Sequence, residues 1–146
     1  MNDQKLRKAI TDDSEFAYQT RKVAFQEYVE QSSGWNEEEQ RQLHKRRFAS
    51  QDFYVIQTSG IDVGILAMSR QPDCIKLYQM FLLPEYQNRG IGAVCMSRII
   101  KEATTSKLPI RLQVLKVNNR AAVFYQRLGF KRTGESDTHI LMERYP

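Results

Sequence analysis

The stretch that decides the fold is PEYQNRGIGAVCMSRII, residues 84–100. It places Gln87 and Arg89 before two glycines, Gly90 and Gly92, and then runs into an amphipathic helical pattern. The first backbone N–H groups of a helix have no intrahelical partner, and the helix dipole makes that end positive. Glycines let a ligand approach those groups, and an arginine adds a charge that suits phosphate. The stretch therefore predicts a loop and a helix start that bind an anion.

The segments around this loop alternate between strand and helix patterns. Apolar or alternating runs predict strands at 5–10, 52–59, 62–69, 74–83, 109–117 and 138–145. Helical patterns with capping signals fall at about 12–32, 36–48, 91–106 and 118–129. Gly60 is expected to join two of the strands as a tight hairpin. This order predicts an α/β or α+β fold, with a mixed, mostly antiparallel sheet and helices on both faces.

Length and composition fit a single globular domain over residues 1–146. No apolar run approaches the roughly 18 residues of a membrane span, and the N-terminal segment lacks the apolar core of a signal peptide. Cys74 and Cys95 have neither metal-ligand nor disulfide-framework spacing. We therefore expect a cytoplasmic protein without a membrane partner or a metal site.

The net charge of +5 is unevenly placed along the chain. Residues 1–50 hold nine basic and nine acidic side chains, whereas residues 51–146 hold thirteen basic and eight acidic ones. A nucleic-acid-binding protein would need a clustered basic patch and a recognition motif, and the sequence has neither. A mildly basic solvated surface, or a small anionic ligand near the glycine loop, fits the charge distribution. We therefore expect no nucleic-acid partner.

The spacing of the glycine loop narrows the choice of anion. No Gly-Lys-Ser/Thr follows, which excludes a Walker A loop, and the third glycine of a dinucleotide fingerprint is absent. The residues from Gln87 to Gly92 match the pattern Q/R-x-x-G-x-G/A instead. On its own, this pattern is equally compatible with a structural glycine turn.

A second motif lies further along the chain, in NNRAAVFYQRLGF, residues 118–130. It combines Asn118, Ala121 and Tyr125 with a Gly-Phe pair that closes the helix. Two helical turns separate Asn118 from Tyr125, so both side chains share one helix face. Taken together and in this order, the two motifs resemble the GNAT superfamily of acetyl-CoA-dependent N-acyltransferases. The resemblance covers about residues 55–145.

The resemblance implies that acetyl-CoA is the co-substrate and that an amine attacks its thioester directly in a ternary complex. It also implies that Tyr125 protonates the leaving thiolate as a general acid. The glycine loop would bind the pyrophosphate, and the strand before it would pair with the pantetheine amides. The implied cofactor-binding residues are Phe81, Leu82, Leu83, Gln87, Asn88, Arg89, Gly90, Ile91, Gly92, Asn118 and Tyr125.

The general base and the acceptor are less defined. Family members often carry a glutamate on the central strand, where this chain has Tyr78, Gln79 and Met80. Gln79 cannot act as a base, although it can orient a water molecule. About residues 1–50 would form the variable acceptor side, and about 52–145 the coenzyme A core. The candidate acceptor-binding residues are Tyr28, Trp35 and Gln79.

The segment from Phe25 to Glu39 holds five glutamates and no basic residue. An acidic, aromatic rim of this kind would suit a cationic amine, but such charge runs are more often only solvated surfaces. His44 is expected to be exposed on a polar helix, and His139 lies in the last strand without a visible partner. Cys95 falls on the apolar face of its helix and is expected to pack in the core.

Two functional hypotheses follow. The first is an N-acetyltransferase whose acceptor is a primary amine, with a small molecule preferred over a protein amine. The alternative is a non-catalytic acyl-CoA-binding sensor or interaction module with the same fold. Tyr125 together with the complete loop favours the enzyme. Family members often pair through edge strands, so the resemblance also allows a homodimer.

Overall fold

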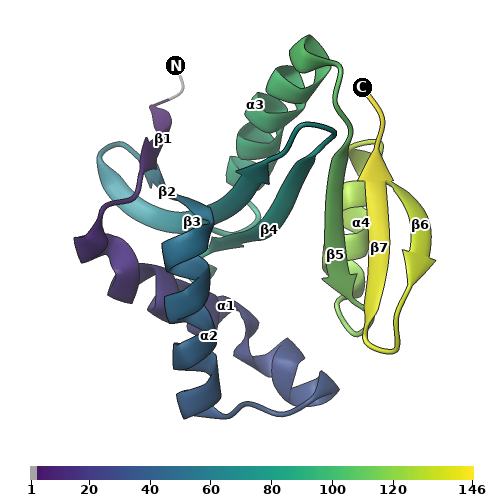
Figure 1. The fold of residues 1–146 in the computed structure, drawn as a ribbon. Coiled ribbons are helices and arrows are strands. Elements are labelled where there is room, and N and C mark those ends of the chain that lie inside the picture. Colours follow the sequence, from purple (N-terminus) through teal and green to yellow (C-terminus); the bar gives the residue numbers. More distant parts are fainter. Residues whose placement is uncertain (1–2) are drawn as a thin grey trace.

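The protein is described by a computed structural model over residues 3–146, which form one seven-stranded sheet with helices on both faces (Figure 1). The strands are β1 (Gln4–Lys8), β2 (Asp52–Thr58), β3 (Ile61–Arg70), β4 (Ile75–Leu82), β5 (Ile110–Leu115), β6 (Lys131–Glu135) and β7 (His139–Arg144). The helices are α1 (Ser14–Ser32), α2 (Glu37–Ser50), α3 (Ile91–Ser106) and α4 (Asn119–Arg127), with short 3-10 turns at η1 (Thr11–Asp13) and η2 (Pro84–Tyr86).

The strand order is β1-β2-β3-β4-β5-β7-β6, and every neighbouring pair is antiparallel except β4 with β5. The predicted mixed, mostly antiparallel sheet is therefore confirmed. The predicted hairpin between β2 and β3 is also present, with positive φ angles at Ser59 (51°) and Gly60 (78°). Two residues with positive φ form the type of tight turn that matches the twist of the flanking strands.

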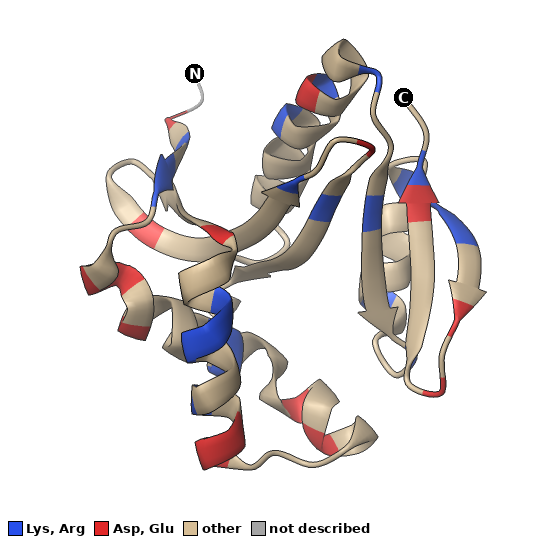
Figure 2. Cartoon of the chain, viewed as in Figure 1, with Lys and Arg blue, Asp and Glu red and all other residues tan. Residues whose placement is uncertain are grey.

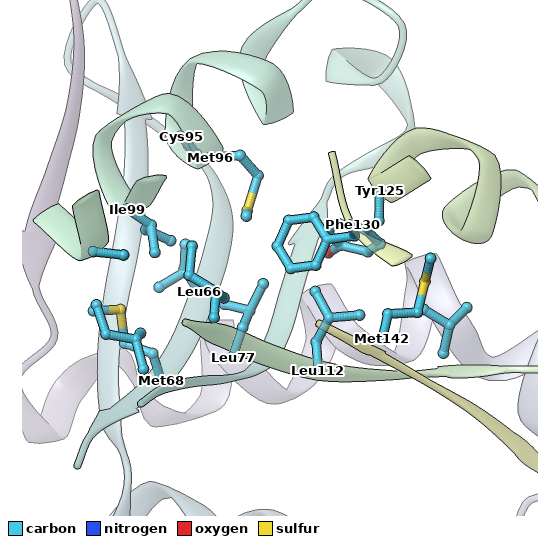
Figure 3. Packing of buried hydrophobic residues seen from close by; sticks show 14 of the residues in the cluster. Leu66, Met68, Leu77, Cys95, Met96, Ile99, Leu112, Tyr125, Phe130 and Met142 are labelled. Carbon is cyan, nitrogen blue, oxygen red and sulfur yellow. The ribbon is translucent and has the colours of Figure 1, made fainter. Parts of the chain in front are cut away.

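Two apolar clusters show which helices cover which face of the sheet. On one face, α3 and α4 pack on strand residues that include Leu66, Leu77 and Leu112, as Figure 3 shows. On the other face, α1 and α2 pack on a smaller cluster around Phe53 and Ile65. Alternation along the strands explains this division, because successive side chains point to opposite faces. The sheet therefore separates an α1/α2 side from an α3/α4 side.

The sheet opens between its two central strands. β4 and β5 pair only through Ile75–Ile110 and Lys76–Arg111, and beyond Lys76 they separate (Figure 1). A bulge lies at the same place, because Gln79 faces Ala67 of β3 while Leu77 faces Met68, which leaves Tyr78 as an extra residue. Bulges bend the strand that carries them. The bulge and the loss of pairing together create an opening that crosses the sheet.

Two details differ from the sequence-based expectation. β6 was not predicted, because its residues KRTGE are polar and almost all exposed, so no apolar alternation marks them. His44 was predicted to be exposed, and that is wrong: it is 7% exposed and lies against Tyr18, Phe48 and Phe53. The packing of α2 on α1 and β2 buries it. Within residues 3–146, no helix combines the length and apolar character needed to cross a membrane.

Candidate cofactor and acceptor site

A cavity of about 1080 Å³ occupies the opening between β4 and β5. Its walls come from β4, β5, α1, α4 and the first turn of α3, so it reaches both sides of the sheet. Pockets for cofactors and other small ligands usually measure about 300–1,000 Å³, so the cavity lies at the upper end of that range. The sequence-predicted residues that line it are Tyr28, Gln79, Phe81, Leu82, Gln87, Asn88, Gly90, Ile91, Gly92, Asn118 and Tyr125.

The glycine loop leaves the start of α3 open. Gly90 precedes the helix with a φ of +81°, and a Cβ atom added there would meet no atom within 4 Å. Among the described residues, no side chain caps this helix end. Gln87 donates a hydrogen bond of 3.0 Å from Nε2 to the carbonyl oxygen of Leu82, which holds the loop against the end of β4. The first N–H groups of α3 are thus available to an anion in the cavity.

Gly92 plays a packing role as well. A Cβ atom there would lie 3.4 Å from Met80 Cε and 3.5 Å from Phe124 Cζ, which is ordinary van der Waals contact. An alanine would therefore fit, whereas a larger side chain would displace Met80 or Phe124. The small residue at this position reflects the close approach of α3 to β4 and α4.

Three of the predicted residues do not line the cavity. The N–H group of Leu83 donates to the carbonyl oxygen of Val63 at 2.9 Å, so it is not available to a pantetheine amide. The Arg89 guanidinium lies over the Tyr86 ring, 5.4 Å from its centre. Trp35 stacks on side chains of α1 behind the cavity wall. The structure therefore places Leu83, Arg89 and Trp35 around the site rather than in its wall.

Asn118 and Tyr125 reach the cavity from α4. Asn118 caps the helix, because its Oδ1 accepts a hydrogen bond of 3.1 Å from the Ala121 N–H. Its amide NH₂ group keeps its donors for a ligand. Tyr125 is 8% exposed and packs edge-on against Phe124 and Phe130, with ring centres 5.1 and 5.4 Å away.

The Tyr125 hydroxyl has no hydrogen-bond partner among residues 3–146. Burial raises its pKa, because the phenolate would lose hydration in this apolar setting. The group therefore stays protonated at neutral pH and can donate a proton or a hydrogen bond into the cavity.

The charge on the cavity wall is of one sign. No aspartate or glutamate of residues 3–146 lines the cavity, but five basic side chains do. They are Arg21, Arg47, Lys76, Arg120 and Arg127. Arg120 donates a hydrogen bond to Asn88 in the glycine loop. The cavity is thus a cationic environment.

The glutamates between Phe25 and Glu39 do not line this cavity. Glu37 pairs with Lys22 at 2.9 Å and with Arg41 at 3.2 Å, and it accepts a hydrogen bond from Trp35. Figure 2 shows the acidic first turn of α2 at the end away from the sheet and its basic residues nearer to the sheet. The carboxylates of residues 25–39 lie outside the cavity, as the more common alternative of a solvated surface predicts.

Among the cavity residues that were not predicted are Arg21, Arg47 and His139. Arg21 carries a signal in retrospect, because it shares a helix face with Phe25 and Tyr28 at i, i+4 and i+7 spacing. An arginine on an otherwise apolar face needs an explanation. Arg47 and His139 carry no comparable signal, since only tertiary packing brings α2 and β7 to one cavity.

Known proteins are similar to this chain in sequence and in fold. The profile of the family described as "Acetyltransferase (GNAT) domain" matches residues 49–132, which is more than half of the chain. An uncharacterized N-acetyltransferase of Methanocaldococcus jannaschii is 28% identical, over 54% of this chain and 38% of that protein. The peptidyl-lysine N-acetyltransferase YjaB of Salmonella typhimurium is 31% identical, over 46% of this chain and 43% of that protein. The matches thus cover less than half the length of either relative.

Solved structures show the same fold at low sequence identity. The PaiA N-acetyltransferase of Thermoplasma acidophilum, crystallised in complex with coenzyme A, superposes with a TM-score of 0.80 at 17% identity. The superposition covers 98% of this chain and 99% of that one. The profile match, the relatives and the fold agree with one another, and this chain belongs to the GNAT acetyltransferase family.

Proposed function

We propose that this protein transfers an acetyl group from acetyl-CoA to a primary amine of a small molecule by direct attack. The observation that carries the proposal is the cavity between β4 and β5, which Tyr125, Asn118 and the open start of α3 all line. The relatives named as N-acetyltransferases and the neighbour that holds coenzyme A support it.

The pyrophosphate of the co-substrate fits the start of α3. The first N–H groups of that helix supply donors, the dipole favours negative charge, and Gly90 keeps side chains out of the way. The edge of β4 beyond Lys76 has no strand partner on the β5 side within residues 3–146, so its backbone can pair with pantetheine amides. Phe81 and Asn118 are the candidates for these contacts, since both line the cavity.

Tyr125 is the proposed general acid. As coenzyme A leaves, its sulfur gains negative charge, and a neutral phenol beside it can supply a proton. Burial raises the pKa of Tyr125 and keeps the phenol protonated, and the same apolar setting destabilises the thiolate and makes it a stronger base, so that it can take the proton.

Activation of the amine does not require a carboxylate in this proposal. A free alkyl amine has a pKa of about 10.4 and is mostly protonated at neutral pH. Neighbouring positive charges lower the pKa of a bound ammonium, because they disfavour its charged form. The cationic wall can therefore release the amine proton to water, with the amide of Gln79 orienting that water molecule.

Two measurements test the proposal together. Calorimetric titration gives the affinity for coenzyme A, and release of free thiol from acetyl-CoA is followed across a panel of amines. Amine-dependent thiol release is the expected result. Tight coenzyme A binding without thiol release for any amine would rule out the enzyme and leave a binding module.

A further inference from the structure

Two arginines line the cavity from the α1/α2 side, and neither has a carboxylate partner within the described residues 3–146. Arg21 is 6% exposed, and its guanidinium donates a hydrogen bond of 2.7 Å from Nη1 to Gln40 Oε1. The rings of Phe25 and Trp35 lie over it, each 5.4 Å from the guanidinium carbon. The Arg47 side chain is half-buried and has no hydrogen bond or ion pair to any residue of 3–146.

This pair differs from the arginines that form ion pairs on the surface. Five arginines on the surface have a carboxylate within ion-pair distance: Arg7, Arg41, Arg70, Arg111 and Arg132. Arg21 and Arg47 are more buried and have none, although a buried charge is costly unless it is paired. Burial and the nearby charge of Arg47 lower the pKa of Arg21 to about 10. The two guanidiniums therefore repel each other in a site that lacks a counter-ion from the described chain.

An independent observation in the same cavity also indicates a missing ligand. Gln79 is 5% exposed, and neither its amide nitrogen nor its amide oxygen has a hydrogen-bond partner among residues 3–146. It lines the cavity one residue past the bulge at Tyr78. An unpaired buried amide destabilises the fold, and a polar ligand that pairs with it can recover that loss. The amide and the two arginines face one space.

We propose that the acceptor amine carries an anionic group, a carboxylate or a phosphate, which binds to Arg21 and Arg47 beside Gln79. This inference rests on the proposed acetyl transfer, and it names the chemical class of the acceptor. Guanidinium groups present paired donors that match the oxygens of either anion. The anion neutralises Arg21 and Arg47, whereas Lys76, Arg120 and Arg127 keep the rest of the cavity wall cationic.

The phosphates of the co-substrate are a poor alternative occupant. The α3/α4 side of the sheet carries the start of α3 together with Asn118 and Tyr125. Arg120 lies on this side too, beside the glycine loop. Arg21 and Arg47 belong to helices that cover the opposite side. The opening between β4 and β5 connects the two sides, so each substrate can enter from its own side.

The test measures binding to the protein saturated with coenzyme A, which has no acetyl group to transfer. The probes are common α-amino acids, each compared with its own amide, together with aminoalkyl phosphonates and a linear aliphatic diamine. Calorimetry gives the affinities. Fluorescence of Trp35, the single tryptophan, reports occupation of the Arg21 site that it covers. If the anionic group pairs with the arginines, at least one amino acid should bind at least about tenfold more tightly than its own amide, or at least one phosphonate should bind that much more tightly than the diamine.

Substitutions identify the groups responsible. In Arg47→Gln the preference for the anionic probe should disappear, while coenzyme A affinity stays unchanged. Arg46→Gln is the matched control, because this neighbouring arginine is exposed and does not line the cavity. The control should keep the full preference. Preference for a phosphonate over a carboxylate would assign the anion as a phosphate, and the reverse order would assign a carboxylate.

Two results would overturn the inference. One is equal or tighter binding of the amides or the diamine, and the other is a preference for anions that survives Arg47→Gln. If amines without an anionic group then cause thiol release from acetyl-CoA, the proposed function stands and only this inference falls. If anionic probes bind through Arg47 but no amine releases thiol, the proposed function falls while the anion site remains.

Discussion

Trp35 covers Arg21, with 5.4 Å between the centre of its ring system and the guanidinium carbon. Its Nε1 donates a hydrogen bond of 3.0 Å to Glu37, which fixes the indole above α1. The tryptophan thus belongs to the support of the cavity wall rather than to its lining. A cation beneath an aromatic face is stabilised by about 0.5–2 kcal/mol, depending on how far it is desolvated.

The first prediction concerns this stacking. Trp35→Leu should raise KM for the acceptor by about tenfold and leave kcat nearly unchanged, because it loosens Arg21 without touching the reacting atoms. Trp35→Phe keeps an aromatic face and should lie between the two. Steady-state thiol release with varied acceptor gives both constants. A loss of kcat with unchanged KM would mean that Trp35 contributes to the chemical step instead.

The second prediction concerns the general acid. Tyr125→Phe keeps the ring that packs on Phe124 and Phe130 but removes the proton donor, so kcat should fall about 10²-fold or more. The affinity for acetyl-CoA should change little. Tyr145→Phe is the control, since Tyr145 is 65% exposed and does not line the cavity. Unchanged turnover in Tyr125→Phe would show that this tyrosine only packs.

The third prediction separates two properties of Gly92. Gly92→Ala should retain coenzyme A affinity and keep or raise stability, because its Cβ atom makes only ordinary contacts and alanine favours a helix by about 0.5–1 kcal/mol. Gly92→Leu should displace Met80 or Phe124, with a cost of about 1–3 kcal/mol, and weaken coenzyme A binding. Titration and thermal unfolding of both variants provide the test. Retained coenzyme A affinity in Gly92→Leu would show that the cofactor does not approach the start of α3 closely.

The α3/α4 side of the cavity, where we propose that coenzyme A binds, could be described from the sequence because its signals are local. Gly90 needs a positive φ, and Asn118 caps the helix that it opens, so each residue type is explained by its own few neighbours. The helices and most strands follow from apolar periodicity for the same reason. These features depend on short stretches of chain, which the sequence presents directly.

The acceptor side could not be predicted in the same way. Gln79 and Tyr28 were expected near the acceptor, but Arg21 and Arg47 were not, because only the packing of α1 and α2 on the sheet brings these arginines to the cavity. Glutamates between Phe25 and Glu39 were prominent in the sequence, yet Glu37 is engaged in surface ion pairs. The burial of His44 likewise depends on a helix partner that the polar neighbours in its sequence do not reveal.

The fourth prediction concerns the pH dependence of stability. Burial lowers the pKa of His44 and of His139, the two histidines of the chain, so the folded state disfavours their protonation. Below the unfolded value of about 6.5 the unfolded chain binds more protons, and the free energy of unfolding therefore falls as the pH falls. Each histidine contributes a slope of at most about 1.4 kcal/mol per pH unit.

Denaturant unfolding between neutral and mildly acidic pH measures this slope. His44→Gln should reduce it more than His139→Gln, because His44 is the more buried of the two histidines. Equal slopes in the wild type and both variants would contradict the assignment to the histidines. Arg7 holds the pKa of Asp13 below its usual range, so that group acts only at lower pH.

The central claim is acetyl transfer within the cavity between β4 and β5. Its most direct test compares the free thiol released from acetyl-CoA with the acetylated amine formed, the latter identified by mass spectrometry. The account predicts equal amounts of the two products, both lost together in Tyr125→Phe. Saturable coenzyme A binding with no acetylated amine, for any acceptor in a broad panel, would contradict it.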